Sequence, residues 1–162
     1  MPHESLLIGL SQIGAVFAGF MAVFIALAQR DGRLDPVSAL RARSILYTSV
    51  TTIAAALLPL VIFAAGLTGD ASLKISAGVA ALMGLGLSIE GARHQMALTP
   101  EQKRATGLVF NIVSWGFSGV AFAVAVAIVF GAIHADYYPL SVFVMLIVSA
   151  ANFVKISLEQ WL

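Results

Sequence analysis

Long apolar runs dominate the chain and limit the folds that are open to it. A helix needs about 20 mostly apolar residues to cross the hydrocarbon core of a bilayer, and five segments reach or approach that length. They cover residues 5–28, 45–67, 73–89, 108–133 and 139–154. Charged residues make up only 10% of the 162 residues and hydrophobic residues 60%, a balance that leaves too few charges to cover a soluble domain. We therefore expect an all-α, polytopic transmembrane helical bundle that forms a single integral membrane domain. It has five spans, or four if the third or the fifth segment is not a full span.

Capping signals indicate where three of the helices begin. Asp35 is a good N-cap, and Pro36 then takes the first helical position, where its missing N–H costs nothing. In the sequence TPEQ, Thr99 is a second N-cap and Gln102 follows three residues later, as in a capping box. The fifth segment opens at Pro139. These signals predict a polar helical lead-in to the second span and a fourth helix that starts at TPEQ.

The basic residues are distributed unevenly between the two sides of the expected bundle. Two connecting segments, about 29–44 and 90–105, and the end of the fifth run hold eight of the nine Lys and Arg residues: Arg30, Arg33, Arg41, Arg43, Arg93, Lys103, Arg104 and Lys155. Only Lys74 falls on the opposite side. The positive-inside rule makes the basic side cytoplasmic, so we expect the N-terminus outside and the C-terminus inside. Tyr137, Tyr138 and Trp161 bracket the fifth span as an aromatic belt would.

The first span, within LIGLSQIGAVFAGFMAVFIALAQRD, separates into two faces on a helix. One face is small or polar apart from two valines, and we call it the Gln12 seam: Ser5, Gly9, Gln12, Val16, Gly19, Val23 and Ala26. The other is a bulky stripe of Leu10, Ile13, Phe17, Phe20, Phe24 and Leu27. Membrane helices associate by close packing and buried hydrogen bonds, so we expect the seam to face protein and the stripe to face lipid. Packing within one bundle is the favoured interpretation, and a subunit interface or a pore axis is the alternative.

Two further helices carry ridges of small residues. The third span has Ser76, Ala80, Gly84, Ser88 and Ala92 at four-residue steps, and the fourth has Gly119, Ala123, Ala127 and Gly131. A five-helix bundle of this size has few interior positions. We therefore expect some of these ridges to serve a homo-oligomer.

The central third of every expected span lacks Asp, Glu, Lys, Arg and His. Proton pumps and ion-coupled transporters usually keep such a group near the midplane, so this pattern disfavours those mechanisms. The second span instead carries Thr48, Thr51 and Thr52 in its inner half, followed by Pro59, which frees a carbonyl and favours a kink. The hydroxyls either form hydrogen bonds within one kinked helix, or they line a hydrated cavity together with Gln12, Asn111 and Asn152.

Charged residues near the cytoplasmic ends of the third and fifth spans match in depth. Glu90 lies about 27 Å along its helix from Ser72, and Lys155 lies about 24 Å from Pro139. We therefore predict an interhelical ion pair between Glu90 and Lys155. An ordinary interfacial pair is the favoured interpretation, and a cytoplasmic gate or a lipid head-group site is the alternative.

Motifs for catalysis or cofactor binding are missing from the sequence. There is no cysteine, HExxH, GxSxG or phosphate-binding glycine loop. His3, His134 and Asp136 on the outer side form a weak metal-binding pattern, and solvated loop residues are the favoured interpretation. We expect no catalytic residue, no metal and no cofactor, and the net charge of +1 gives no footprint for nucleic acid.

The first helix, SQIGAVFAGFMAVF, resembles the opening helix of small, uncharacterised bacterial multi-helix membrane proteins that share an AGF pattern. An arginine-led second helix with a mid-helix proline, from Arg43 to Pro59 here, is similar too. The resemblance implies a multi-pass protein of the bacterial inner (cytoplasmic) membrane. It implies no known activity.

These patterns favour a non-catalytic integral membrane bundle. We expect it to self-assemble or to serve as a structural or accessory subunit of a membrane complex, with the lipid bilayer and other membrane subunits as partners. The alternative is a homo-oligomeric ion channel or small-solute permease, lined by the Gln12 seam and the hydroxyls of the second span.

Overall fold

All regular secondary structure in the residues that the computed structural model describes is helical. The structure describes the backbone of residues 1, 3–30 and 36–159, and the side chains of these residues except 28–30, 36, 105–106, 108–111, 113 and 156–159. Within these limits the chain forms α1 (Glu4–Arg30), α2 (Pro36–Ala64), α3 (Gly69–Met96), α4 (Pro100–Thr106), α5 (Leu108–Val129), the 3₁₀ turn η1 (Ala135–Tyr137) and α6 (Tyr138–Glu159).

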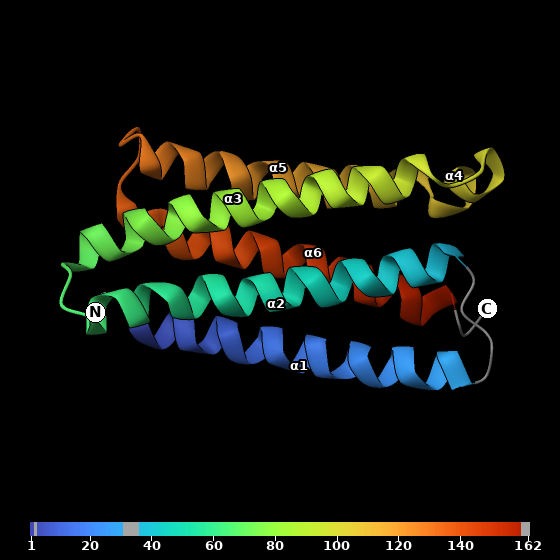
Figure 1. Cartoon of the computed structure of the whole chain (residues 1–162), viewed down its shortest axis with the longest axis horizontal. Coiled ribbons are helices and arrows are strands. Elements are labelled where there is room, and N and C mark those ends of the chain that lie inside the picture. The colour runs from blue at the N-terminus through green and yellow to red at the C-terminus, as the bar shows by residue number, and fades with distance from the viewer. Residues whose placement is uncertain (2, 31–35, 160–162) are drawn as a thin grey trace.

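The long helices lie side by side in one elongated bundle (Figure 1). α2 and α6 occupy its centre, because α2 contacts α1, α3 and α6, while α6 contacts α1, α2 and α5. α1 therefore lies at one edge of the bundle, and α3 and α5 pack together on the other side. One consequence is that α1 keeps a broad outer face that no other helix covers.

In the part of the chain that the structure describes, four helices are long and apolar enough to cross a membrane, which confirms an all-α bundle with several membrane-length helices. They are Glu4–Leu27, Val37–Ala64, Gly69–Met96 and Ala135–Lys155. The third and fifth segments, named as the doubtful ones, are both among them. In α5, the apolar helix found among the described residues is Ser114–Val129, which is shorter.

The helices extend further at the basic end of the bundle than the apolar runs predicted. α2 already begins at Pro36 and α3 continues to Met96, so much of the sequence expected in two cytoplasmic loops is helical. The Arg41 side chain is buried within this lead-in. Asp35, the predicted N-cap, lies outside the described residues.

The fourth predicted helix is divided in two by Gly107. The Thr99–Gln102 capping box is present as predicted, since the Gln102 amide donates to the Thr99 hydroxyl at 3.3 Å and the Thr99 amide to the Gln102 side chain at 3.0 Å. The helix that it opens stops after seven residues, because Gly107 has φ +80° and ψ 138°. α5 then ends at Val129, four residues before the predicted limit.

α2 continues without a break through Pro59. Proline has no N–H, so the carbonyl of Ala55 four residues earlier loses its helical donor. The buried hydroxyl of Tyr138 donates to that carbonyl at 2.7 Å and joins α6 to α2. Tyr138 is thus a core residue and not part of an aromatic belt, whereas Tyr137 is 55% exposed. Trp161 lies outside the described residues.

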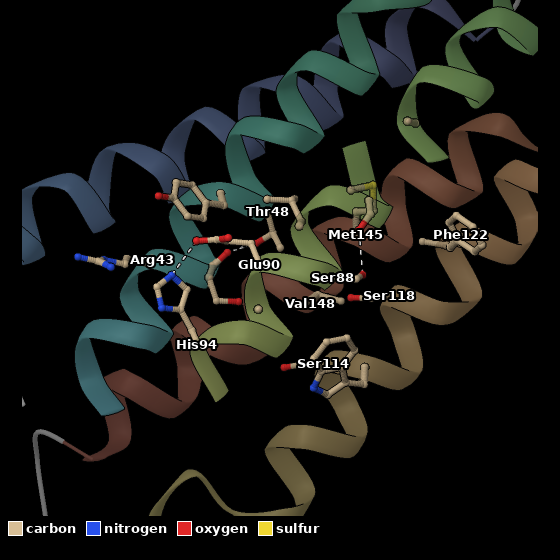
Figure 2. A pocket seen from close by; sticks show the side chains of 18 of the residues that line it. Arg43, Thr48, Ser88, Glu90, His94, Ser114, Ser118, Phe122, Met145 and Val148 are labelled. Atoms are coloured by element: carbon tan, nitrogen blue, oxygen red, sulfur yellow. Dashed lines mark hydrogen bonds and ion pairs between the residues drawn. The ribbon is translucent and has the colours of Figure 1, made fainter. Parts of the chain in front are cut away.

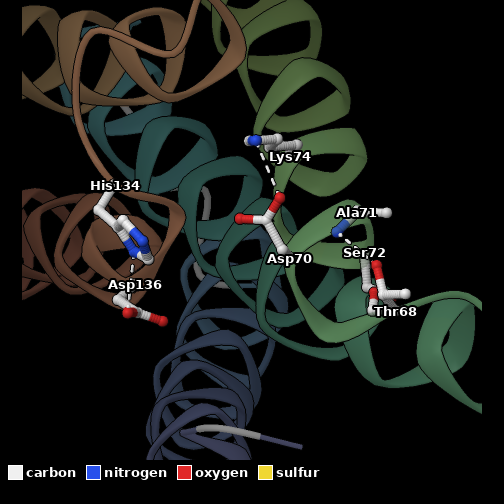
Figure 3. Close-up of polar contacts among 7 residues, drawn as sticks. All are labelled: Thr68, Asp70, Ala71, Ser72, Lys74, His134 and Asp136. Carbon is white, nitrogen blue, oxygen red and sulfur yellow. Dashed lines mark hydrogen bonds and ion pairs between the residues drawn. The ribbon is translucent and has the colours of Figure 1, made fainter.

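Short polar contacts organise the end of the bundle where α3 and η1 begin (Figure 3). Thr68 caps α3, accepting from the Ala71 amide at 3.3 Å, and its carbonyl accepts from the Ser72 hydroxyl at 2.8 Å. Lys74 pairs with Asp70 at 2.8 Å. These contacts hold Lys74 at this end of the bundle, whereas the other basic side chains of the described residues belong to the opposite end.

Candidate functional site

The Gln12 seam lies on the outer face of α1. Ser5, Gln12 and Gly19 are exposed and Gly9 is half-buried. A Cβ built on Gly9 or Gly19 would meet nothing within 4 Å. The favoured interpretation, that this seam packs within one bundle, therefore does not describe the structure of the single chain. No helix of the described residues lies against the exposed positions of the seam.

The inner face of α1 is built from part of the stripe that was expected to face lipid. Leu10 is buried there, and Phe17 stacks against Phe153 of α6 with ring centroids 5.6 Å apart. The closest helix approach is at Gly14, where a Cβ would lie 3.1 Å from Ile53 Cγ1 and 3.3 Å from the Ser49 carbonyl oxygen. Gly14 is thus the glycine of α1 that packing against α2 requires.

The two other small-residue ridges also differ in their positions. On α3, Ser76 and Ala80 are buried, and the ridge continues along a cavity through Gly84 and Ser88. On α5, Gly119 lies on an exposed face, and a Cβ there would meet nothing within 4 Å. Only the α3 ridge therefore contributes to packing in the way the sequence predicted.

The predicted polar residues of α2 and α6 meet inside the bundle, away from Gln12. Thr51 and Thr52 are buried, and Thr52 donates to the Thr48 carbonyl at 2.8 Å. Thr48 lies 2.7 Å from the Ser149 hydroxyl of α6. Asn152 is buried and accepts from the Ser114 hydroxyl of α5 at 3.1 Å. The Asn111 side chain lies outside the described part of the chain. One lining that combines the Gln12 seam with the α2 hydroxyls is therefore not present in the single chain.

A cavity of about 130 Å³ lies between α2, α3, α5 and α6 (Figure 2). Along α3 its lining runs from Ala80 to Gln95, a length of about 22 Å at 1.5 Å per residue. Its walls combine apolar side chains with a series of hydroxyls, which belong to Ser44, Tyr47, Thr48, Ser88, Ser114, Ser118 and Ser141. Of the predicted α2 threonines, only Thr48 lines it.

The hydroxyl protons at this cavity are largely committed to protein acceptors. Thr48 donates to the Ser44 carbonyl at 2.7 Å, and Ser88 to the Gly84 carbonyl at 2.8 Å. Ser114 donates to Asn152, and Ser141 to the Tyr138 carbonyl at 2.8 Å. A hydroxyl has one proton and two lone pairs, so these four groups offer acceptors and no further proton.

Glu90 and His94 lie together at the end of the cavity nearest the basic end of the bundle. His94 Nε2 is 2.9 Å from Glu90 Oε1, one helical turn away on α3 (Figure 2). Lys155 lies elsewhere, since its Nζ would be 2.9 Å from a Cβ on Gly107, between α4 and α5. No ion pair joins Glu90 to Lys155 within the described residues. The predicted pair rested on similar distances along the two helices. The direction of the two side chains around α3 and α6 decides the contact, and they do not point toward each other.

Ser114 and Ser118 of α5 were not singled out from the sequence, and both line the cavity. Their four-residue spacing places them on one helix face, as for the serines of α3. This spacing was the sequence signal that could have identified Ser114 and Ser118 as residues of one site. Trp115 also lines the cavity and is 38% exposed.

The three outer-side residues considered for metal binding do come together. Asp136 lies 2.9 Å from His134 Nδ1 and 3.6 Å from His3 Nε2 (Figure 3 shows the first pair). Within the described residues no group of three or more His, Cys, Asp or Glu is arranged to hold a metal ion. The exposed Asp136 carboxylate thus links the start of α1, at His3, to the segment that leads into η1.

No protein-family model matches the chain, and neither the curated proteins nor the solved structures gave a match.

Proposed function

We propose that the protein is a non-catalytic integral membrane bundle that assembles with further copies of itself through the Gln12 seam of α1. The proposal includes five spans, with α5 as the fourth, in a bacterial cytoplasmic membrane. The single observation that carries it is the exposure of Gln12 on an apolar helix at the edge of the bundle.

An exposed carboxamide at this depth needs a partner. Gln12 lies about 12 Å along α1 from Glu4, which puts it within the hydrocarbon layer when Glu4 is at the interface. The structure gives its side chain no hydrogen bond to any described residue. Unsatisfied polar groups in lipid cost several kcal/mol each, so a protein partner on this face would stabilise the bundle.

A second copy of the chain suits the seam chemically. A carboxamide has both donors and an acceptor, so two Gln12 side chains can bond reciprocally across a twofold axis. The open space at Gly9 and Gly19 would let the two α1 backbones approach closely. The seam thereby offers close backbone packing and an interhelical hydrogen bond, the two interactions that drive association of helices in lipid.

The orientation rests on the charges at the two ends of the bundle. One end holds most of the basic residues in the described part of the chain: Arg41, Arg43, Arg93, Lys103, Arg104 and Lys155. The opposite end holds Lys74, already paired with Asp70. The positive-inside rule supports a cytoplasmic location for the first end.

Cysteine cross-linking tests the assembly, because the chain has no native cysteine. Gln12→Cys should form a disulfide-linked dimer in membranes under mild oxidation. The matched control is Leu82→Cys, on the exposed face of α3, which should stay monomeric. Gln12→Leu should shift the mass in detergent toward the monomer. Cross-linking that is equal at positions 12 and 82 would contradict the proposal.

A channel or small-solute permease is the second candidate, and the hydroxyl-lined cavity is the observation that favours it. Its lining would come from α2, α3, α5 and α6, not from Gln12. Solute flux into liposomes that disappears with Gly84→Leu, and persists with Gln12→Leu, would support a path through the cavity. Absence of flux for cations, anions and small neutral solutes would count against it.

A further inference from the structure

The cavity between α2, α3, α5 and α6 opens to the surface of the bundle and has a size suited to a small organic molecule. Its volume of about 130 Å³ is similar to that of an engineered apolar protein cavity of about 150 Å³ that binds benzene. The walls include the apolar side chains of Leu87, Trp115, Phe122 and Met145. These surfaces favour a ligand with a compact apolar body, aromatic or aliphatic.

The polar part of the lining is selective in its hydrogen bonding. Thr48, Ser88, Ser114 and Ser141 each donate their proton to another protein group and keep only lone pairs. These four hydroxyls can accept hydrogen bonds and cannot supply them, whereas Ser44, Tyr47 and Ser118 add three further hydroxyls to the lining. The four committed hydroxyls can therefore receive an N–H or O–H donor of a ligand.

The Glu90 carboxylate at the end of the cavity indicates which kind of hydrogen-bond donor a ligand would carry. Glu90 lines the cavity, and its carboxylate uses one oxygen for His94, which leaves acceptor capacity for a second donor. The Arg43 side chain extends away from the cavity residues Ser88 and Ser118 (Figure 2). Arg43 also lines the cavity, and Glu90 is the acidic residue among the lining residues, so a cationic group of a ligand would meet its carboxylate.

An aromatic surface lies at the same turn of α3 as Glu90. The Trp115 ring reaches across to α3, where its Cη2 would be 4.0 Å from a Cβ on Gly91, the neighbour of Glu90. Trp115 and Glu90 both line the cavity, so a ligand held at Glu90 would have the Trp115 ring as an apolar wall.

We propose that this cavity binds a small organic amine, with its ammonium group on Glu90 and its apolar body against Trp115. The inference is independent of assembly through the Gln12 seam, because α1 contributes no residue to the cavity lining. It names a ligand class for the cavity whether or not the protein moves that ligand across the membrane.

Tryptophan fluorescence in lipid nanodiscs tests the proposal. In a Trp161→Phe background, Trp115 is the only indole, because the chain has two tryptophans. 2-Phenylethylamine should change the Trp115 emission saturably. The neutral isostere 2-phenylethanol should bind about tenfold more weakly, and 3-phenylpropionate should not bind. Isothermal titration calorimetry with the same probes supplies an independent affinity.

Two pairs of variants localise the binding. Glu90→Gln should weaken amine binding about tenfold, whereas Asp70→Asn, at the opposite end of α3, should leave it unchanged. Gly84→Leu should fill the cavity and abolish binding, whereas Gly119→Leu, outside the lining, should not. A Cβ at either glycine meets nothing within 4 Å, so the two substitutions are matched. If Gly84→Leu fails to fold, Ser118→Val carries the same test.

Three results would overturn the proposal. The first is a fluorescence change that grows without saturation, as partitioning into the bilayer would produce. The second is equal affinity for the amine and for 3-phenylpropionate. The third is binding that persists unchanged in Glu90→Gln and in the cavity-filling variant. Loss of self-assembly in Gln12→Leu with amine binding intact would leave this proposal standing.

Discussion

The hydroxyl of Tyr138 donates a 2.7 Å hydrogen bond to the carbonyl of Ala55, the group that Pro59 leaves without its helical donor. The donor comes from the first turn of α6 and the acceptor from the middle of α2. Because both lie in the interior, no solvent can replace the bond. The bond therefore fixes the register of the two central helices.

Tyr138→Phe should destabilise the bundle by about 1–3 kcal/mol, the cost of leaving a buried carbonyl unsatisfied. Unfolding in mixtures of SDS and mild detergent measures this loss. Pro59→Ala supplies the missing N–H, so Tyr138→Phe should cost much less in that background. Equal costs in the native and the Pro59→Ala backgrounds would show that the hydroxyl does not replace the proline's missing donor.

Gly14 and Gly9 should respond in opposite ways to added side chains. Gly14→Val places methyl groups against Ile53 and the Ser49 carbonyl, and should cost about 1–3 kcal/mol through overpacking. Gly9→Ala meets open space and should stabilise the isolated chain by about 0.5–1 kcal/mol through its higher helix propensity. Unfolding of both variants under monomeric detergent conditions makes the comparison, and similar losses would contradict it.

Gly107→Ala should destabilise the junction between α4 and α5. The backbone there has φ +80° and ψ 138°, a region that costs residues with a side chain about 1–3 kcal/mol. Gly116→Ala, in the regular part of α5 with open space around it, is the control and should be neutral or stabilising. Proteolysis of the α4 segment and thermal unfolding both report the difference. An unchanged Gly107→Ala protein would exclude a required glycine.

Accessibility labelling should place Glu4 and Lys103 in different compartments. In intact cells, a membrane-impermeant maleimide should label Glu4→Cys, and should label Lys103→Cys only after permeabilisation. The charge asymmetry of the bundle ends is the physical reason. Labelling of both positions from the same side would contradict five spans with the N-terminus outside.

The helices themselves were predictable because apolar length and capping chemistry are local properties. The Thr99–Gln102 box and the start of α2 at Pro36 follow from residues within one turn. The break at Gly107 was not predictable in this way. A single glycine is compatible with a helix interior, and only the contacts around it determine whether the helix bends or ends.

The inward faces of the helices were harder to predict. In a soluble protein the apolar stripe faces the core, but lipid is as apolar as leucine, so bulky residues carry little information about direction. α1 illustrates this, since Leu10 and Phe17 face the bundle while Leu27 of the same stripe is 58% exposed. Small side chains were no better a guide to helix contacts than bulky ones. Gly14, the glycine that packs against α2, lies off the Gln12 seam.

The cavity was beyond prediction from any one helix. It arises where small residues of different helices, such as Gly84 of α3 and Ser118 of α5, face each other. Each of them separately is typical of close packing. Only their relative rotation decides whether they close together or leave a space.

The Tyr138–Ala55 bond also has a consequence for biogenesis. The two residues are 83 positions apart, so at about 5–20 residues per second a ribosome needs roughly 4–17 s to add the tyrosine after the alanine. During that interval the Ala55 carbonyl oxygen of α2 has no hydrogen-bond donor from Tyr138. Docking of α6 supplies the Tyr138 hydroxyl, so this carbonyl of α2 gains its donor only once α6 has packed against α2.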